Sequence, residues 1–367
     1  DIATKRIFEA IKNNQKIYIY GDYDVDGITS VSLLYLALSE LGANVHYYIP
    51  LRDEGYGLNR EAIQSLKNEN ANLVISVDCG INSIEEINFA NELGLDFIIT
   101  DHHEIIGDLP KAFAVINPKR EENIYSYKYL AGVGTAFMLV YALYSKLDRL
   151  NDLEKFLDIV AIGTVADIVP LTSDNRKFVK RGLKLLNNTK WIGIKQLLRK
   201  VFPEDWDTRE YCSYDVGYLI APIFNALGRI DNSKMVVNFF IQEDDFKIFA
   251  IIEEMKKANK IRRYLEIEIY NEIEEKIQKL NNPKYIFMKS RKWHSGVIGV
   301  VCSRISIKYN IPVILVSIKN GYGKASCRSI EGLNIFDILK ETSDKFDRFG
   351  GHDLAAGFLV SEKYLAE

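Results

Sequence analysis

Short apolar runs alternate with amphipathic segments along the first 120 residues of the chain. Runs typical of buried parallel strands lie at 17–20, 45–49, 73–77 and 95–100. Between them, apolar residues recur at helical spacing in 28–41, 60–68 and 84–93. This alternation predicts an α/β domain whose parallel sheet carries helices on both faces.

The rest of the chain is first helical and then alternates again. Residues 129–200 and 214–280 have mostly helical patterns, with a break expected at Gly163 and a turn at Pro170. The stretch 244–280 lacks Gly and Pro, which predicts a long helix between two domains. Strands are expected at 285–288, 313–317, 324–328 and 355–360, and helices at 298–309 and 334–342. We divide the chain into a parallel-sheet domain at 1–188, a helical connector at 189–281 and a smaller α/β domain at 282–367, with the active site in the cleft between the two α/β domains.

Three of the predicted strands end in acidic or imidazole side chains. These side chains are Asp22, Asp24 and Asp26 after the first run, Asp78 after the third, and Asp101, His102 and His103 after the fourth. Because the carboxyl ends of parallel strands meet at one edge of a sheet, we expect these groups to lie together. Clustered carboxylates repel one another unless a cation holds them, so the sequence predicts a divalent-metal site.

Each acidic motif also has a structural interpretation. We place Asp22, Asp24 and Asp26 at alternate positions of an extended segment that share one face, although one of them, Asp22 most readily, could cap a helix beginning near Gly27. Asp78 could likewise cap a helix near Asn82.

The paired histidines indicate a functional site more clearly than the other motifs, because the chain has only five histidines and two of them are adjacent directly after a predicted strand. Asp167 lies in an otherwise apolar turn and needs a partner or a cation there. Oxygen ligands with one imidazole and no thiolate favour Mn²⁺ or Mg²⁺ over structural Zn²⁺.

Glycine-rich turns in the last domain lie beside groups that can bind phosphate. One such segment, 321–328, ends in Ser326 and Arg328, and another contains Gly351 and His352. Glycines that admit a close backbone approach beside Arg or His suit phosphate oxygens, although a hairpin turn explains them equally well. The basic stretch 256–263 is read as a solvated helix face, with nucleic-acid contact as the alternative.

The composition says more about the cellular compartment of the protein than about its substrate. The chain has 367 residues and a net charge of −3, which argues against a surface coated with phosphate-binding charge but leaves room for a local basic groove. Four scattered cysteines favour a reduced, cytoplasmic setting, and the absence of a long apolar run predicts no membrane contact. Because the chain begins with Asp, we interpret it as a trimmed part of a longer protein.

The motifs together resemble the DHH phosphoesterase superfamily, and within it the RecJ-type exonucleases. The resemblance rests on Asp101-His102-His103 and on segments 21–27, 77–80, 163–170, 293–299 and 350–358, in order and spacing. It implies a DHH domain joined by a helical connector to a DHH-associated domain. The implied activity is 5′→3′ hydrolysis of single-stranded DNA to mononucleotides in DNA repair and recombination, with single-strand-binding protein and a helicase as candidate partners. RecJ-type relatives usually carry a further OB-type domain, for which we find no room here.

The resemblance also implies a role for each motif residue. It makes Asp24, Asp26, Asp78, His102 and Asp167 metal ligands, with Asp78 bridging two ions. Asp22 and His103 are implied to be catalytic, with His103 beside the scissile phosphate. Arg52, Ser326 and Arg328 would hold the 5′-terminal phosphate, and Gly351 and His352 a backbone phosphate.

One departure from the superfamily predicts two unequal metal sites. Pyrophosphatase relatives have a metal-binding His four residues before the equivalent of Asp24, where this chain has Tyr20. We therefore expect a full site of Asp26, Asp78, His102 and Asp167, and a site of Asp24 and Asp78 that is weak without substrate.

Two rival functions remain at this stage. A related DHH phosphodiesterase would cut oligoribonucleotides, cyclic dinucleotides or pyrophosphate, but Tyr20 and the Arg52 segment disfavour it. A non-catalytic scaffold would have lost metal ligands, and here each expected ligand is present.

Overall fold

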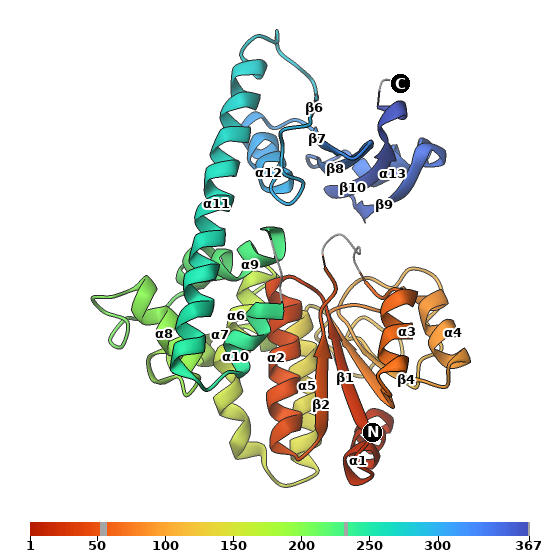
Figure 1. The fold of residues 1–367 in the computed structure, drawn as a ribbon, viewed down its shortest axis with the longest axis vertical. Coiled ribbons are helices and arrows are strands. Elements are labelled where there is room, and N and C mark those ends of the chain that lie inside the picture. The colour runs from red at the N-terminus through yellow and green to blue at the C-terminus, as the bar shows by residue number, and fades with distance from the viewer. Residues whose placement is uncertain (52–56, 231–233, 366–367) are drawn as a thin grey trace. The chain divides into compact units, whose positions relative to one another are not determined.

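The structure, a computed structural model, describes residues 1–51, 57–230 and 234–365 (Figure 1). It divides into two compact units, Asp1–Ala258 and Asn259–Glu367, and each contains one five-stranded sheet. Helix α11 (Asp245–Ile277) begins in the first unit and ends in the second. Within the described ranges, no helix combines the length and the apolar character needed to cross a lipid bilayer.

The sheet of the first unit is entirely parallel. Its strands, in the order β2-β1-β3-β4-β5, are β2 (Asn44–Tyr48), β1 (Lys16–Gly21), β3 (Leu73–Val77), β4 (Asp96–Thr100) and β5 (Ala114–Ile116). Gly21 lies opposite Val77, and Val77 lies opposite Thr100. The acidic and imidazole residues that follow these three strands therefore start from the same edge, as the sequence predicts.

Helices cover both faces of this sheet (Figure 1), which confirms the predicted α/β architecture. One core layer packs around α2 (Val25–Glu40), α5 (Gly132–Ser145) and α6 (Leu157–Ala166), and the other around α3 (Arg60–Asn68) and α4 (Ile84–Glu92). Alternate residues of β1 serve the two layers: Ile17 and Ile19 face the first, and Tyr18 and Tyr20 face the second. Helix α1 (Ile2–Lys12) and strand β5 were not predicted.

Further helices complete the first unit. They are α7 (Ser173–Leu185), α8 (Ile192–Val201), a π-helical segment (Asp215–Ile220) that continues into α9 (Ala221–Ile230), and α10 (Lys234–Ile241), with 3₁₀ turns at Leu150–Phe156 and Leu186–Asn188.

The second unit has a mixed sheet. Its strands, in spatial order, are β6 (Ile286–Ser290), β7 (Val313–Lys319), β8 (Tyr322–Arg328), β10 (Ala355–Ser361) and β9 (Phe346–His352). Only β6 and β7 are parallel to each other. Helix α12 (Ile298–Tyr309) packs with the core beside β6 and β7, and α13 (Ile335–Glu341) packs with the core beside β10. Residues 350–352, whose glycines were compatible with a turn, belong to strand β9.

The predicted break at Gly163 is wrong, because α6 runs through it without interruption. A Cβ at this position would lie 2.1 Å from Thr29 Oγ1 of α2 and 2.8 Å from Val133 Cγ1 of α5. Glycine here admits close packing of three helices and does not end the helix. The chain turns instead after Asp167, where Ile168 has a φ of 62° and precedes Pro170 by two residues.

Substituting Gly163 with Ala should therefore lower the free energy of unfolding by about 1–3 kcal/mol, because the added methyl group overpacks the helix junction. Gly134, on α5, is the matched control, since its added Cβ would meet only ordinary contacts at 3.4 Å. Gly134→Ala should leave stability unchanged or raise it by up to about 1 kcal/mol through helix propensity. Urea unfolding midpoints measure both, and equal effects would contradict the packing role.

Candidate metal centre

The acidic residues of the first motif surround a helix start. Helix α2 begins at Val25, so Asp26 lies in its first turn, and the predicted extended segment is wrong. Asp24, not Asp22, is the N-cap, and its side chain accepts a hydrogen bond from the Gly27 amide at 3.1 Å. Asp24 can therefore cap the helix and still serve as a metal ligand.

Asp26 is held by the amino end of a second helix. Both its carboxylate oxygens accept backbone hydrogen bonds, from Gly132 at 2.6 Å and from Val133 at 2.8 Å. A helix N-terminus favours negative charge, so α5 stabilises the ionised form of Asp26. A Cβ on Gly132 would lie 2.5 Å from Asp78 Oδ1, and only glycine fits there. This contribution was not predicted, although the two glycines at the start of the apolar helix of 132–145 are a signal for it.

Asp78 extends the sheet at the end of β3. Its amide donates to the Thr100 carbonyl at 3.0 Å, and its φ is 59°, in the left-handed region. Helix α4 begins at Ile84 after Ser83, so Asp78 does not cap it. The structural alternative for Asp78 is therefore excluded.

The first histidine of the pair faces the carboxylates. His102 Nε2 lies 3.1 Å from Asp78 Oδ1 and 3.7 Å from both Asp26 Oδ2 and Asp167 Oδ2. A backbone hydrogen bond joins the His102 ring to Leu130. A backbone carbonyl that takes one ring N–H leaves the other nitrogen as an electron-pair donor, the arrangement of a metal ligand.

Asp101 positions both histidines. Its Oδ1 accepts from the amides of His102 at 2.7 Å and His103 at 3.1 Å, and it lies 2.7 Å from His103 Nδ1. Its Oδ2 accepts from the Ile81 amide at 3.0 Å. Asp101 is thus engaged by protein donors and acts on the site through His103.

Seven predicted residues meet at this edge of the sheet. Their donor atoms form three groups within 4.8 Å: Asp26, His102 and Asp167; Asp78, His102 and His103; and Asp22, Asp24 and Asp78. Asp22, which the sequence does not mark as a ligand, joins Asp24 and Asp78 in the third group.

Burial makes this cluster costly without a cation. Desolvation, with the charge of Asp24, raises the pKa of Asp26 to about 7, and desolvation with the charges of Asp26 and Asp24 raises the pKa of Asp167 to about 9. Burial also raises the pKa of Asp78 well above its ordinary value. Asp167 Oδ2 is buried and accepts no hydrogen bond from the part of the chain that the structure describes. An orphaned buried oxygen among carboxylates fits a hard divalent cation.

His102 is suited to the same ion. Its burial, reinforced by the charge of His103, lowers its pKa to about 3, so its imidazole is neutral at physiological pH. A neutral imidazole is the form that binds metal.

Tyr20 belongs to the core layer of α3 and α4. Its side chain is fully buried, its hydroxyl donates to the Gly57 carbonyl at 3.0 Å, and its ring lies 5.1 Å from that of Tyr48. The position that bears a metal-binding His in pyrophosphatase relatives therefore faces the core layer of α3 and α4.

The predicted phosphate-binding pair lies together in the second unit. Arg328 Nη1 donates to Ser326 Oγ at 3.3 Å, and Arg328 Nε donates to Ser303 Oγ of α12 at 2.8 Å. A Cβ on Gly299 would lie 3.1 Å from Ser326 Oγ, so glycine admits α12 close to the pair. Arg52, the third predicted member, lies outside the described residues.

Gly351 and His352 lie on the exposed edge strand β9. His352 is opposite Ala355, and Ala355 is opposite Arg328, so His352 and Arg328 project from the same face two strands apart. Gly350 and Gly357 form the neighbouring row with Ser326. Small residues thus separate the Ser326–Arg328 pair from His352.

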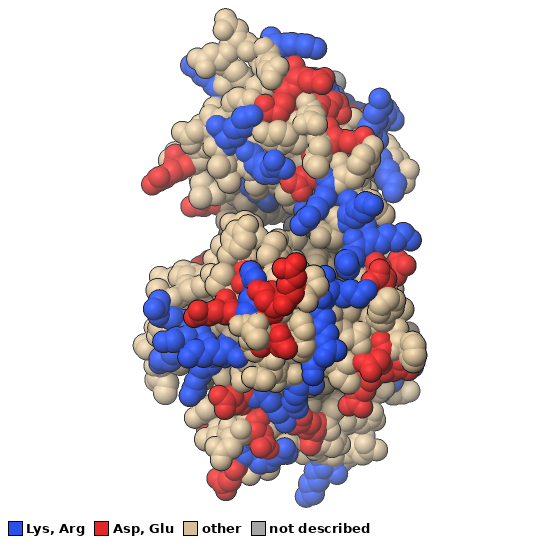
Figure 2. Space-filling view, turned by 90° about the vertical axis from the view of Figure 1, so that its left-hand side faces the viewer, with Lys and Arg blue, Asp and Glu red and all other residues tan. Residues whose placement is uncertain are grey.

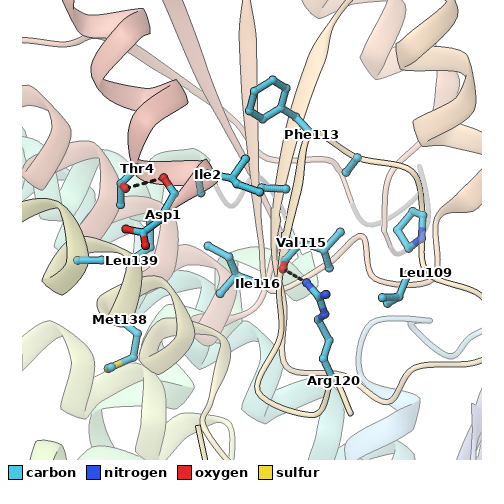
Figure 3. A pocket seen from close by; sticks show the side chains of 15 residues that line it. Asp1, Ile2, Thr4, Leu109, Phe113, Val115, Ile116, Arg120, Met138 and Leu139 are labelled. Atoms are coloured by element: carbon cyan, nitrogen blue, oxygen red, sulfur yellow. Dashed lines mark hydrogen bonds between the residues drawn. The ribbon is translucent and has the colours of Figure 1, made fainter. Parts of the chain in front are cut away.

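A separate pocket of about 720 Å³ lies beside the edge strand β5 (Figure 3). Apolar side chains of α1, β5 and α5 line it, together with Arg120, whose Nη1 donates to the Val115 carbonyl at 2.6 Å. None of the predicted site residues lines this pocket, and Arg120 occupies an edge carbonyl of the sheet. It is not part of the candidate site.

Replacing Asp101 with Asn should lower the pKa of His103. Burial lowers this pKa, but the hydrogen bond and charge of Asp101, together with the charges of Asp26 and Asp22, raise it above its ordinary value. Asp101 therefore stabilises the folded protein below the His103 pKa, and this stabilisation is lost as pH rises through it. NMR titration of the metal-free protein measures the change. Glu104→Gln, on the same loop, should leave the His103 midpoint in place, and an unchanged midpoint in D101N would refute the assignment.

Comparison with known proteins agrees with this site. Residues 16–164 match the DHH family, N-terminal domain, and residues 282–367 match the DHHA1 domain. The single-stranded-DNA-specific exonuclease RecJ of Bacillus subtilis (strain 168) is 40% identical over 362 residues, 98% of this chain and 45% of that protein. RecJ of Haemophilus influenzae is 34% identical over 386 residues, 100% of this chain and 67% of that protein. The chain thus spans about half to two thirds of the length of these relatives.

Solved structures extend the similarity to the fold. Exonuclease RecJ bound to manganese has a TM-score of 0.86 and 32% identity, over 98% of this chain and 90% of that one. RecJ of Thermus thermophilus in complex with Mn²⁺ has a TM-score of 0.87 and 30% identity, over 99% of this chain and 52% of that one. By motifs, fold and sequence, the chain belongs to the RecJ family of DHH proteins.

Proposed function

We propose that this chain is the catalytic part of a metal-dependent exonuclease that hydrolyses single-stranded DNA from the 5′ end. Mononucleotides are the products, and DNA repair and recombination are the cellular roles. The observation that carries the proposal is the cluster of buried carboxylates and one neutral imidazole at the sheet edge. The relatives are named single-stranded-DNA-specific exonucleases, and a solved relative is bound to manganese. We keep the three-part division at 188 and 281 as part of this proposal.

The metal ions are Mn²⁺ or Mg²⁺, held in two unequal sites. Asp26, Asp78, His102 and Asp167 hold the stronger one. Asp24 and Asp78 hold the weaker one, and Asp22, within 4.8 Å of both, is a candidate additional ligand. When bound, such cations neutralise charge on a phosphate and lower the pKa of water at the site.

The protein groups position the substrate and move protons. Asp101 fixes the His103 ring and keeps it protonated to a higher pH than usual. A protonated imidazole beside the scissile phosphate can donate to the phosphate or to the departing oxygen. His103 therefore serves as a general acid, and Asp101 positions it.

Recognition of the 5′ end is assigned to the second unit. Ser303 and Ser326 hold the Arg328 guanidinium, which is suited to a terminal phosphate. Arg52 is proposed to join it. The row of small residues Gly350, Gly357 and Ala355 lies between Arg328 and His352, and we assign the sugar–phosphate backbone to it.

We assign the selectivity for single strands to local side chains and not to the overall charge of the surface. On the face drawn in Figure 2, basic and acidic side chains are interspersed, and the net charge is −3. Tyr214 and Tyr218 are 60% and 67% exposed and stacked with ring centroids 4.9 Å apart. Exposed rings of this kind can stack on unpaired bases. Single-strand-binding protein and a helicase remain proposed partners.

The alternative is a DHH phosphodiesterase for oligoribonucleotides or cyclic dinucleotides. A ladder of end-labelled oligonucleotides of increasing length distinguishes the two functions. Turnover restricted to the shortest oligonucleotides or to cyclic dinucleotides would favour the alternative.

Asp78→Asn should abolish nuclease activity, with a loss of several kcal/mol of transition-state stabilisation, because Asp78 belongs to two of the three ligand groups. The assay uses single- and double-stranded DNA labelled at either end, with Mn²⁺ or with EDTA. Wild type should release the 5′ label of single strands first, and only with metal. Asp96→Asn is the control, since Asp96 starts β4 and pairs with Arg6 at 2.7 Å. Near-normal turnover by D78N would exclude the proposed centre.

Arg328→Met should remove the preference for a 5′-phosphate over a 5′-hydroxyl. Losing a charged hydrogen bond costs about 1.5–3 kcal/mol, which is roughly a 10- to 150-fold loss in kcat/KM on the phosphorylated substrate. Arg304→Met is the matched control, because the Arg304 guanidinium is paired with Glu266 at 2.7 Å in the same unit. A preference that survives in R328M would place 5′ recognition elsewhere.

A further inference from the structure

Asn175, on α7, is a fully buried polar residue outside the ligand set. Its Nδ2 donates to the Tyr129 carbonyl at 2.6 Å and to the Pro170 carbonyl at 3.1 Å. Because both partners are carbonyls, the amide orientation is fixed: turning it over would set oxygen against oxygen. Oδ1 accepts no hydrogen bond from the described residues. A buried acceptor left in this way costs about 1–3 kcal/mol, which offsets much of what the two donated hydrogen bonds contribute to stability.

The first segment that Asn175 holds surrounds the metal ligands. Tyr129 directly precedes Leu130, which is hydrogen-bonded to the His102 ring. The same segment continues to Gly132 and Val133, whose amides hold Asp26. Any drift of residues 129–133 therefore moves two ligands at once.

The second segment carries Asp167. It turns immediately after this residue, where Ile168 is 88% exposed and has a φ of 62°. A β-branched residue in this region is strained by about 1–3 kcal/mol, so the turn persists only where other contacts fix it. The Pro170 carbonyl is such a point, since it accepts from Asn175 and from the Tyr127 hydroxyl at 2.9 Å.

We propose that Asn175 is a positioning residue for the metal centre: it ties the segment that orients Asp26 and His102 to the strained turn that presents Asp167. Its side chain touches neither substrate nor cation. It keeps the three donors of one ligand group within reach of a single ion. This inference rests on the proposed function, because it concerns the ion that those donors would hold.

The test compares Asn175→Leu with a matched control. Leu has the same number and branching of side-chain heavy atoms as Asn, and it removes both donated hydrogen bonds. The control is Asn187→Leu, since Asn187 Nδ2 likewise bridges two carbonyls, those of Asp207 at 3.0 Å and Arg209 at 2.9 Å, in the same unit. Calorimetric titration with MnCl₂ gives the affinity. Hydrogen–deuterium exchange without metal reports the protection of peptides covering 129–133 and 167–170.

N175L should bind Mn²⁺ about 10- to 100-fold more weakly, as removal of a group that orients a ligand typically does. It should also exchange faster in both peptides. N187L should lose stability with neither change. Where N175L does not fold, Asn175→Ser keeps one donor and should show the same two changes to a smaller extent.

A folded Asn175 variant that keeps the wild-type Mn²⁺ affinity and the wild-type rates of hydrogen–deuterium exchange would overturn the inference. An equal loss of Mn²⁺ affinity in N187L would also overturn it, because the effect would then be general destabilisation. A wild-type protein that binds no Mn²⁺ would instead refute the proposed function. In that case the exchange data alone still decide whether Asn175 holds the two segments together.

Discussion

Repulsion among buried carboxylates is the constraint that shapes the first unit. Asp26, Asp78 and Asp167 project to one edge of a parallel sheet, where burial and mutual charge raise their pKa values. Neither Asp26 nor Asp167 pairs with Lys or Arg in the described ranges. The surrounding fold must supply a substitute for such a counter-charge, or leave room for one.

The fold supplies a substitute for the counter-charge and also leaves room for a cation, and the substitute consists mostly of backbone N–H groups. The amino end of α5 points two N–H groups at Asp26, while Asp101 uses three backbone amides to fix the loop of both histidines. Backbone donors neutralise charge without adding side-chain volume, which leaves the centre of the cluster to a cation. Gly132 also makes room at the cluster, because the Asp78 carboxylate occupies the space that a Cβ on this residue would fill.

The sequence was a good guide where a pattern is periodic or local. The strand ends at Val77 and Thr100 follow from apolar runs, and the end of β1 lies one residue beyond its run; the register places Asp78 and His102 at one edge. Helix α12 also has its predicted bounds. Strand β5, with only three residues, is too short for a periodic signal. Strand β9 was hidden by its glycines and its exposure on both faces.

The errors share one physical origin, the tertiary approach of distant segments. Gly163 has the composition of a helix break, but its role depends on Thr29 and Val133, which no local pattern contains. The sequence predicts that Asp26 belongs to an extended acidic run, but Asp26 lies in a helical turn. Its carboxylate is bound by residues more than a hundred positions away. Asn175 carries no signal at all until its two carbonyl partners are seen.

Two unfavourable local features lie close to the candidate centre. Ile168 has a left-handed φ, which strains a β-branched residue, and an acceptor of Asn175 is left without a partner among the described residues. Elsewhere the same backbone region is used by residues that tolerate it, such as Asn14 and Asn70. Strain of this kind persists only where the surrounding structure over-determines it, and it holds donors in place before a ligand arrives. A cation that binds only the folded state would stabilise the protein in return. The local instability and the affinity of the site are therefore two consequences of one arrangement.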